Sequence, residues 1–80
     1  MKVRVKLFAT LGRYTGREEL PGKSFEVELF EVAALNDLLR QLNIPAEEVK
    51  LCFVNARSQE PDFTLQDGDE VGIFPPIGGG

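Results

Sequence analysis

The stretch Leu35-Asn36-Asp37-Leu38-Leu39-Arg40-Gln41-Leu42 decides the fold, because its leucines recur at the spacing of one helix face. Positions i, i+3, i+4 and i+7 form an apolar stripe, and polar residues fill the opposite face. Asn43, followed by Ile44 and Pro45, ends the predicted helix, whereas its start carries no clear side-chain cap. A helix with one apolar stripe must bury that stripe against a second layer, so the flanking segments complete the argument.

Two segments before the helix alternate between polar and apolar residues, which is the pattern of a half-buried strand. Residues 2–8 and 24–29 each place three apolar side chains on one face, namely Val3, Val5, Leu7, Phe25, Val27 and Leu29. We expect an antiparallel hairpin in which Phe8 ends the first strand. In its wide loop, Thr10 is expected to cap a short helical turn over residues 11–15 that Gly16 ends.

Shorter elements follow the helix. Residues 45–50 are long enough for one more helical turn, and the continuous apolar run 51–54 predicts a strand buried on both faces. Residues 55–57 predict a turn. The tight turn at residues 66–69 needs a positive φ at Gly68, and residues 70–74 form the last strand.

The resulting order is strand, strand, helix, strand, strand. One long helix across one face of a four-stranded mixed sheet gives an α+β fold of the β-grasp, or ubiquitin-like, kind. The 80 residues allow one such domain, which we place at residues 1–76, with residues 77–80 as a flexible glycine tail.

The composition provides few side chains with which the chain itself could catalyse a reaction. There is no histidine and one cysteine, which excludes a Ser-His-Asp triad and a zinc site of the usual Cys/His kind. The formal net charge of −4 argues against nucleic acid as the main partner and suits a partner with a basic docking surface. The lone cysteine and the lack of a signal-peptide or membrane-length apolar run favour a cytoplasmic protein.

The last seven residues, Phe74-Pro75-Pro76-Ile77-Gly78-Gly79-Gly80, are the strongest functional signal. Two prolines end the last strand and keep the following chain extended, while the glycines offer no side chain to pack. A terminal carboxylate on bare backbone can enter a narrow channel of another protein's active site. The alternative is a frayed end or a cloning remnant without function.

Three stretches together resemble the MoaD/ThiS family of ubiquitin-like sulfur carriers. They are residues 8–16, residues 65–71 with Gly-Asp before the last strand, and the tail from Phe74 to Gly80. The resemblance covers nearly the whole chain, and the pair Pro75-Pro76 is most similar to the small subunit of molybdopterin synthase. Gly78 departs from the family pattern, because a bulkier residue often precedes the diglycine. This departure leaves open a tungsten-type pterin or another sulfur pathway.

The resemblance implies a carrier rather than an enzyme, with no cofactor or metal of its own. A ubiquitin-activating-like adenylyltransferase of the MoeB/ThiF type would adenylate the Gly80 carboxylate, and sulfur would displace AMP to give a thiocarboxylate. A large subunit of the MoaE type would then receive the tail, which comprises Pro75, Pro76, Ile77, Gly78, Gly79 and Gly80. Neither nucleic acid nor a membrane is expected as a partner.

Other residues have plainer interpretations. Phe74 is either the last core residue or a docking anchor, and we favour the anchor because aromatic side chains are common at interfaces. Cys52 lies in an apolar run and is expected to be an inert core residue. Asp67 and Asp69 are expected to form a turn, and Arg57 to be solvated.

Two further functions stay open at this stage. The chain could be a protein modifier joined through its C-terminus to lysines, as ubiquitin is, or an interaction module with an inert tail. A thiamin-pathway carrier is a close variant of the first proposal. All of these need the same fold, so the fold is the first expectation to examine.

Overall fold

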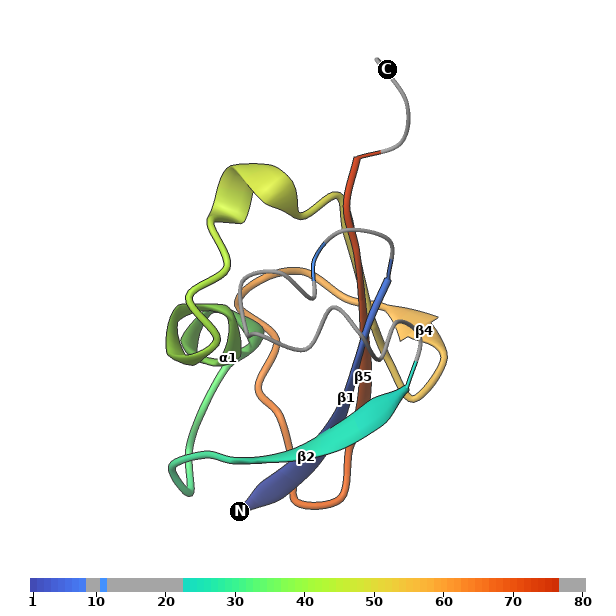
Figure 1. The fold of residues 1–80 in the computed structure, drawn as a ribbon. Helices are drawn as coiled ribbons and strands as arrows, with labels where there is room; N and C mark the ends of the chain where they lie inside the picture. Colours follow the sequence, from blue (N-terminus) through green and yellow to red (C-terminus); the bar gives the residue numbers. More distant parts are fainter. Residues whose placement is uncertain (9–10, 12–22, 77–80) are drawn as a thin grey trace.

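The computed structural model describes residues 1–8, 11 and 23–76, and in them it contains a five-stranded sheet with one α-helix (Figure 1). The strands are β1 (Lys2–Leu7), β2 (Ser24–Glu28), β3 (Leu51–Val54), β4 (Arg57–Ser58) and β5 (Glu70–Phe74). The helix α1 spans Leu35–Gln41, and the 3-10 turn η2 spans Ala46–Glu48. The predicted α+β class, with one main helix and one sheet, is confirmed.

The sheet order is β2-β1-β5-β3-β4, so the first and the last strand of the chain lie side by side at its centre. β1 pairs antiparallel with β2, which confirms the predicted hairpin, and parallel with β5. β3 pairs antiparallel with both β5 and β4. Because β1 and β5 run in the same direction, the chain starts at one end of the sheet and β5 finishes at the other (Figure 1).

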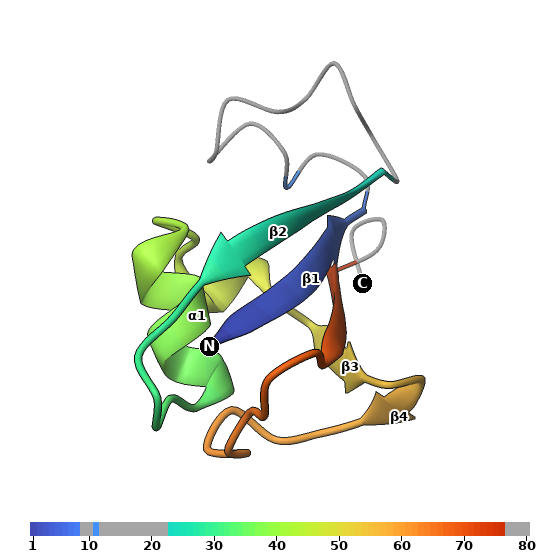
Figure 2. The same ribbon diagram turned by 90° about the horizontal axis from the view of Figure 1, so that it is seen from below.

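The core lies between α1 and the face of the sheet that the helix covers (Figure 2). All four residues of the leucine stripe are buried, as predicted: Leu35, Leu38, Leu39 and Leu42. Alternate strand residues meet them, as a period of two requires, and these include Val3, Val5, Leu7, Val27, Val71 and Ile73. Burying each such side chain fully stabilises the fold by about 1.5–3 kcal/mol, so this layer supplies most of the driving force.

The start of α1 is held by a distant loop, which explains why its sequence lacks a capping side chain. The Leu35 N–H donates to the Phe63 carbonyl at 3.0 Å, and the Asn36 N–H donates to the Pro61 carbonyl at 3.0 Å. Both belong to the first N–H groups of the helix, which have no partner within it, and the Asn36 N–H is one that a Ser or Asp cap could satisfy. In addition, Asp37 Oδ2 accepts from the Ala34 N–H at 2.8 Å.

The other end of α1 stops at Asn43, as predicted, and its backbone geometry gives the reason. Asn43 has a φ of 61°, and its N–H donates to the Arg40 carbonyl at 3.1 Å. The Ile44 N–H donates to the Leu39 carbonyl at 3.0 Å. This pair of bonds is the Schellman arrangement, in which a left-handed residue, usually Gly and sometimes Asn, ends a helix.

The expectation that residues 51–54 are buried on both faces is wrong. Cys52 and Val54 point into the core, but Leu51 is 44% exposed and Phe53 is only half-buried. A continuous apolar run cannot show whether a second layer exists. Within the described residues α1 covers one face only, so the other face of β3 presents apolar side chains to its surroundings.

The strand count also differs, because β4 adds a fifth strand that two residues are too few to predict by periodicity. β3 and β4 are joined by Asn55 and Ala56, whose φ values of 51° and 70° are those of a tight hairpin turn. The predicted positive φ at Gly68 is confirmed at 87°. The short helical turn expected at residues 11–15, with Thr10 and Gly16 at its ends, lies outside the described residues except for the buried Leu11.

Candidate functional site: the end of β5 and the open face of the sheet

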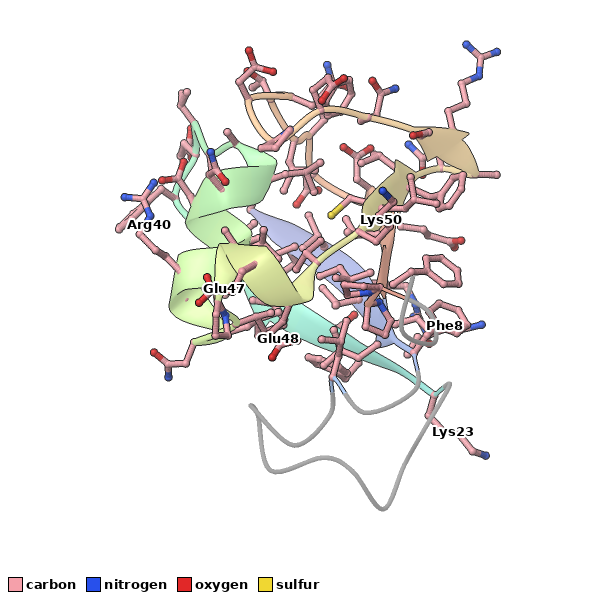
Figure 3. The ribbon with its side chains drawn as sticks, turned by 90° about the horizontal axis from the view of Figure 1, so that it is seen from above. Phe8, Lys23, Arg40, Glu47, Glu48 and Lys50 are labelled. Atoms are coloured by element: carbon pink, nitrogen blue, oxygen red, sulfur yellow. The ribbon has the colours of Figure 1, made fainter. Side chains whose placement is uncertain are left out.

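β5 carries the root of the C-terminal tail, and both of its edges are hydrogen bonded as far as its last residues. The Phe8 N–H donates to the Ile73 carbonyl at 3.1 Å, and the Lys50 N–H donates to the Phe74 carbonyl at 2.8 Å (Phe8 and Lys50 are labelled in Figure 3). Pro75 follows without an N–H, so the strand ends there, as predicted. The root of the tail is therefore anchored in the centre of the sheet.

The candidate tail residues beyond the two prolines lie outside the described residues; they are Ile77, Gly78, Gly79 and Gly80. Their proposed role stays a prediction. Among the described elements, β5 is the strand that leads into the tail, and it ends at the opposite end of the sheet from Met1 (Figure 1).

Three phenylalanines from three strands or strand ends meet on the face that α1 leaves open, and we call Phe8, Phe53 and Phe74 the phenylalanine cluster. The rings of Phe8 and Phe74 are stacked, with centroids 4.1 Å apart and planes 7° apart. Phe53 meets Phe74 edge-on at 5.5 Å and 82°. Such pairs stabilise by about 0.5–1.5 kcal/mol beyond area burial, so the cluster orients the last side chain before the tail.

Gly72, near the middle of β5, lies beneath this cluster. A Cβ placed at Gly72 would lie 3.5 Å from Phe8 and 3.6 Å from Phe74, which is ordinary van der Waals contact. A glycine inside a strand often marks a place where another group approaches the backbone closely. Because Gly72 has no side chain, the surface of the sheet is recessed next to the two stacked rings.

A groove of about 680 Å³ extends over this recessed surface. Its lining includes the phenylalanine cluster, Gly72, and two cations of β1, Arg4 and Lys6. In the register of the sheet, Arg4 lies between Glu26 of β2 and Glu70 of β5. Lys6 lies between Ser24 and Gly72, neither of which is charged.

The structure thus brings Phe74 together with two residues that the sequence reasoning did not assign to a site. Phe74 is half-buried on the open face and does not belong to the core beneath α1. The sequence predicts only a strand end at Phe8 and a core residue at Phe53. A usable signal existed, because Phe8 continues the outward-facing series Lys2, Arg4 and Lys6 and so places an apolar ring on the polar face.

Asp67 and Asp69 form the predicted turn. Asp67 Oδ1 accepts from the Lys2 N–H at 2.8 Å, and Asp69 Oδ2 accepts from the Gln66 N–H at 2.7 Å. Asp69 Oδ1 also accepts from the Asn55 side chain at 2.9 Å, which ties the turn to the β3–β4 hairpin. In the part of the chain that the structure describes, no group of three or more His, Cys, Asp or Glu residues could hold a metal ion.

Cys52 is buried in the core, and burial raises the pKa of its thiol above the usual range. A raised pKa keeps the sulfur protonated and therefore poorly nucleophilic, in agreement with the expected inert role. Arg57 is exposed in β4, as predicted for a solvated residue. Of the helices in the described segments, none is long and apolar enough to cross a membrane.

The chain is similar to a known family and to solved structures over nearly its whole length. The ThiS family model matches residues 5–80. No curated protein matches the sequence. Among solved structures, a putative molybdopterin converting factor, subunit 1, from Pyrococcus furiosus is 31% identical, with a TM-score of 0.72; the match covers 96% of this chain and 99% of that one.

Two more distant structures share the ubiquitin-like β-grasp fold. SAMP1 from Haloferax volcanii is 21% identical with a TM-score of 0.73, and the match covers 100% of both chains. A chain in the complex of subunits 1 and 2 of the molybdopterin-converting factor from Helicobacter pylori is 21% identical with a TM-score of 0.62, again over 100% of both chains. At these identities the likeness establishes the fold alone.

Proposed function

Because this chain belongs to the ThiS family, we propose that it is a sulfur carrier protein and the small subunit of a molybdopterin synthase. Its Gly80 carboxylate is adenylated by a ubiquitin-activating-like enzyme of the MoeB/ThiF type. The adenylate is then converted to a thiocarboxylate, which serves as sulfur donor in molybdenum or tungsten cofactor biosynthesis. The chain itself is a carrier and not an enzyme.

The observation that carries this proposal is the 31% identity to a putative molybdopterin converting factor, subunit 1, over almost the full length of both chains. Among the alternatives within the family, it favours the molybdopterin branch over the thiamin branch. The sequence Pro75-Pro76 ahead of three glycines supports the same choice.

The chemistry needs an activated terminus and little else from this chain. A carboxylate does not accept sulfide directly, because the leaving group would be oxide. Attack of a Gly80 oxygen on ATP releases pyrophosphate and forms an acyl adenylate, and a sulfur nucleophile then expels AMP from the acyl carbon. The last residues are glycines, so no side chain hinders attack at that carbon.

The described part of the chain docks on the partner protein and directs the tail toward the partner's active site. Phe74 is the proposed anchor, held by Phe8 and Phe53 one residue before Pro75. The two prolines fix φ, and the four residues beyond them can extend about 13 Å, which is enough to cross the wall of a partner. The partners are the activating enzyme and a large synthase subunit of the MoaE type, in keeping with the two-subunit complex of the Helicobacter pylori factor.

A second candidate is a ubiquitin-like modifier joined through Gly80 to lysines of other proteins. SAMP1, the small archaeal modifier protein 1, shares the fold of this chain, so the fold is compatible with this function as well. Both functions use an adenylated glycine terminus, so they differ only in the reaction that follows adenylation. Terminal thiocarboxylate on the free protein favours the carrier, whereas isopeptide-linked conjugates favour the modifier.

The proposal is tested by extending the tail by one residue after Gly80. The extended chain should fold with an unchanged melting curve, because the buried core residues that the structure describes all precede Pro75. It should fail to support ATP–pyrophosphate exchange by the activating enzyme, because the Gly80 carboxylate becomes an amide and the new terminal carboxylate lies one residue beyond the position that the adenylation site accepts. Normal exchange with the extended tail would contradict a role for the Gly80 carboxylate as carrier or modifier terminus, and no exchange with the wild-type chain would leave the inert-tail module.

A further inference from the structure

The groove beside the phenylalanine cluster carries a local charge that differs from that of the whole chain. The protein has a formal net charge of −4, which by itself suits a basic partner surface. Among the described residues, the groove is lined by two cations, Arg4 and Lys6, and by one carboxylate, that of Glu70. The sign of the charge that a docked partner meets is therefore set locally.

The two cations of the groove are not equivalent. Arg4 is flanked by Glu26 and Glu70 in the sheet register, and its guanidinium donates to Ser24 Oγ at 3.2 Å. Lys6 has uncharged residues directly opposite it in both neighbouring strands, whereas within the described segments neither cation forms an ion pair. Among the described residues that line the groove, the exposed ammonium of Lys6 is thus the cation with no carboxylate directly opposite in the sheet.

Lys6 also lies at the end of the groove where the rings are. It precedes Phe8 by two residues on the same face of β1, and in the sheet it pairs with Gly72, over which the stacked rings lie. An apolar side chain placed on Gly72 would contact Phe8 and Phe74, and the group next to it would meet the Lys6 ammonium.

We infer that this groove recognises a partner surface that presents a carboxylate beside an apolar side chain, with Lys6 as the residue that sets the sign of the charge. The inference rests on the proposed function, because it describes how the activating enzyme or the large subunit docks on the open face. It differs from what the net charge alone suggests, namely a basic partner surface.

Charge complementarity of this kind acts mainly on the association rate and is screened by salt. An apolar anchor, in contrast, keeps most of its contribution at high salt. The binding of wild-type protein to its partner should therefore weaken with added NaCl and level off at a residual affinity supplied by the phenylalanine cluster.

The test uses the full chain and both proposed partners, the activating enzyme and the large subunit of the same organism. Affinity is measured at low salt and at high salt for wild type, Lys6→Gln, Lys6→Glu and Lys2→Gln. Lys2→Gln is the matched control, because Lys2 is exposed on the same strand and face as Lys6 but at the end remote from the cluster. Melting curves verify that every variant is folded.

At low salt, Lys6→Gln should weaken binding about 3-fold and Lys6→Glu about 10-fold, and both differences should nearly vanish near 0.5 M NaCl. Lys2→Gln should stay within about twofold of wild type. Tighter binding by Lys6→Glu than by wild type would overturn the inference in favour of a basic partner surface. Affinities of both Lys6 variants equal to that of wild type at low salt would overturn it too, because Lys6 would then make no contribution to binding. If wild type binds neither partner, the proposed function fails and this inference fails with it.

Discussion

The two faces of the sheet differ in how their apolar residues are arranged. On the covered face, the side chains of Val5, Leu38 and Ile73 are fully shielded by α1 and the strands. On the open face, Phe53 and Phe74 are packed against each other yet stay half-exposed. One face has the burial that stabilises a small domain, and the other has the partial burial that a docking surface requires.

The difference teaches that apolar character alone does not separate folding from function. β3 and β5 contribute to both faces, because successive side chains of a strand point to opposite sides. Cys52 and Phe53 are neighbours in the sequence, but one is buried in the core and the other lines the groove. Substitutions on the two faces should therefore separate stability from binding.

The largest expected effect lies on the covered face. Leu38→Ala removes a side chain that is 0% exposed and should lower the free energy of unfolding by about 2–5 kcal/mol, because a cavity is left behind. Chemical denaturation monitored by circular dichroism measures this change. A variant that unfolds at the wild-type midpoint would show that the helix does not pack on the sheet.

The next effect lies on the open face. Phe74→Ala should weaken binding to the activating enzyme or the large subunit by about 1–3 kcal/mol, because an aromatic anchor is lost. Its stability should fall less than that of Leu38→Ala, since the ring is half-exposed. Calorimetric titration against either partner measures the binding change, and equal affinities of variant and wild type would assign Phe74 to stability alone.

A smaller effect of opposite sign is expected at Gly72. Gly72→Ala introduces a Cβ at ordinary contact distance from Phe8 and Phe74, so no clash results. The substitution should raise the free energy of unfolding by up to about 1 kcal/mol, because alanine loses less backbone freedom than glycine in a strand. Melting curves measure it, and a clear loss of stability would mean that the stacked rings cannot accommodate a methyl group.

The smallest effect concerns Cys52 and depends on pH. Burial raises the pKa of this thiol above its ordinary value of 9.0, so the folded state favours the protonated form. The unfolded chain loses the proton at lower pH, and the stability that the thiol contributes is complete below pH 9.0 and lost as the pH rises beyond it.

The measurement for Cys52 is the difference in unfolding free energy between wild type and Cys52→Ala at several pH values. This difference should be constant near neutrality and should shrink at alkaline pH. A difference that does not change with pH would mean that the thiol is as well solvated as in the unfolded chain, and the covered face would then be less dry than described.

The sequence predicted the covered face well and the open face poorly, for a physical reason. The leucine stripe and the alternating strands are periodic, and periodicity reports which side chains share a face. The β3 run was assigned to core on both faces, because local sequence does not record whether a second layer exists. The start of α1 was also ambiguous, since carbonyls of Phe63 and Pro61, distant in sequence, take the place of a cap.

The candidate site was predicted only in part. Phe74 and the two prolines could be assigned to the root of the tail because they are contiguous with it in sequence, and the function of the tail stays a prediction. The contacts of Phe74 with Phe8 and Phe53 depend on strand order and register, which bring residues of three separate segments together. The electrostatic role proposed for Lys6 rests on the same register, which the composition of the chain does not reveal.

The central claim is that Gly80 is the reactive end of a carrier, and the intact mass of the protein tests it most directly. The protein is incubated with the activating enzyme, ATP and a sulfur donor, beside the form extended by one residue. We expect wild type to gain the mass difference between one sulfur and one oxygen, located at the C-terminus, and the extended form to keep its mass. An unchanged wild-type mass, or a gain placed elsewhere in the chain, would contradict the account.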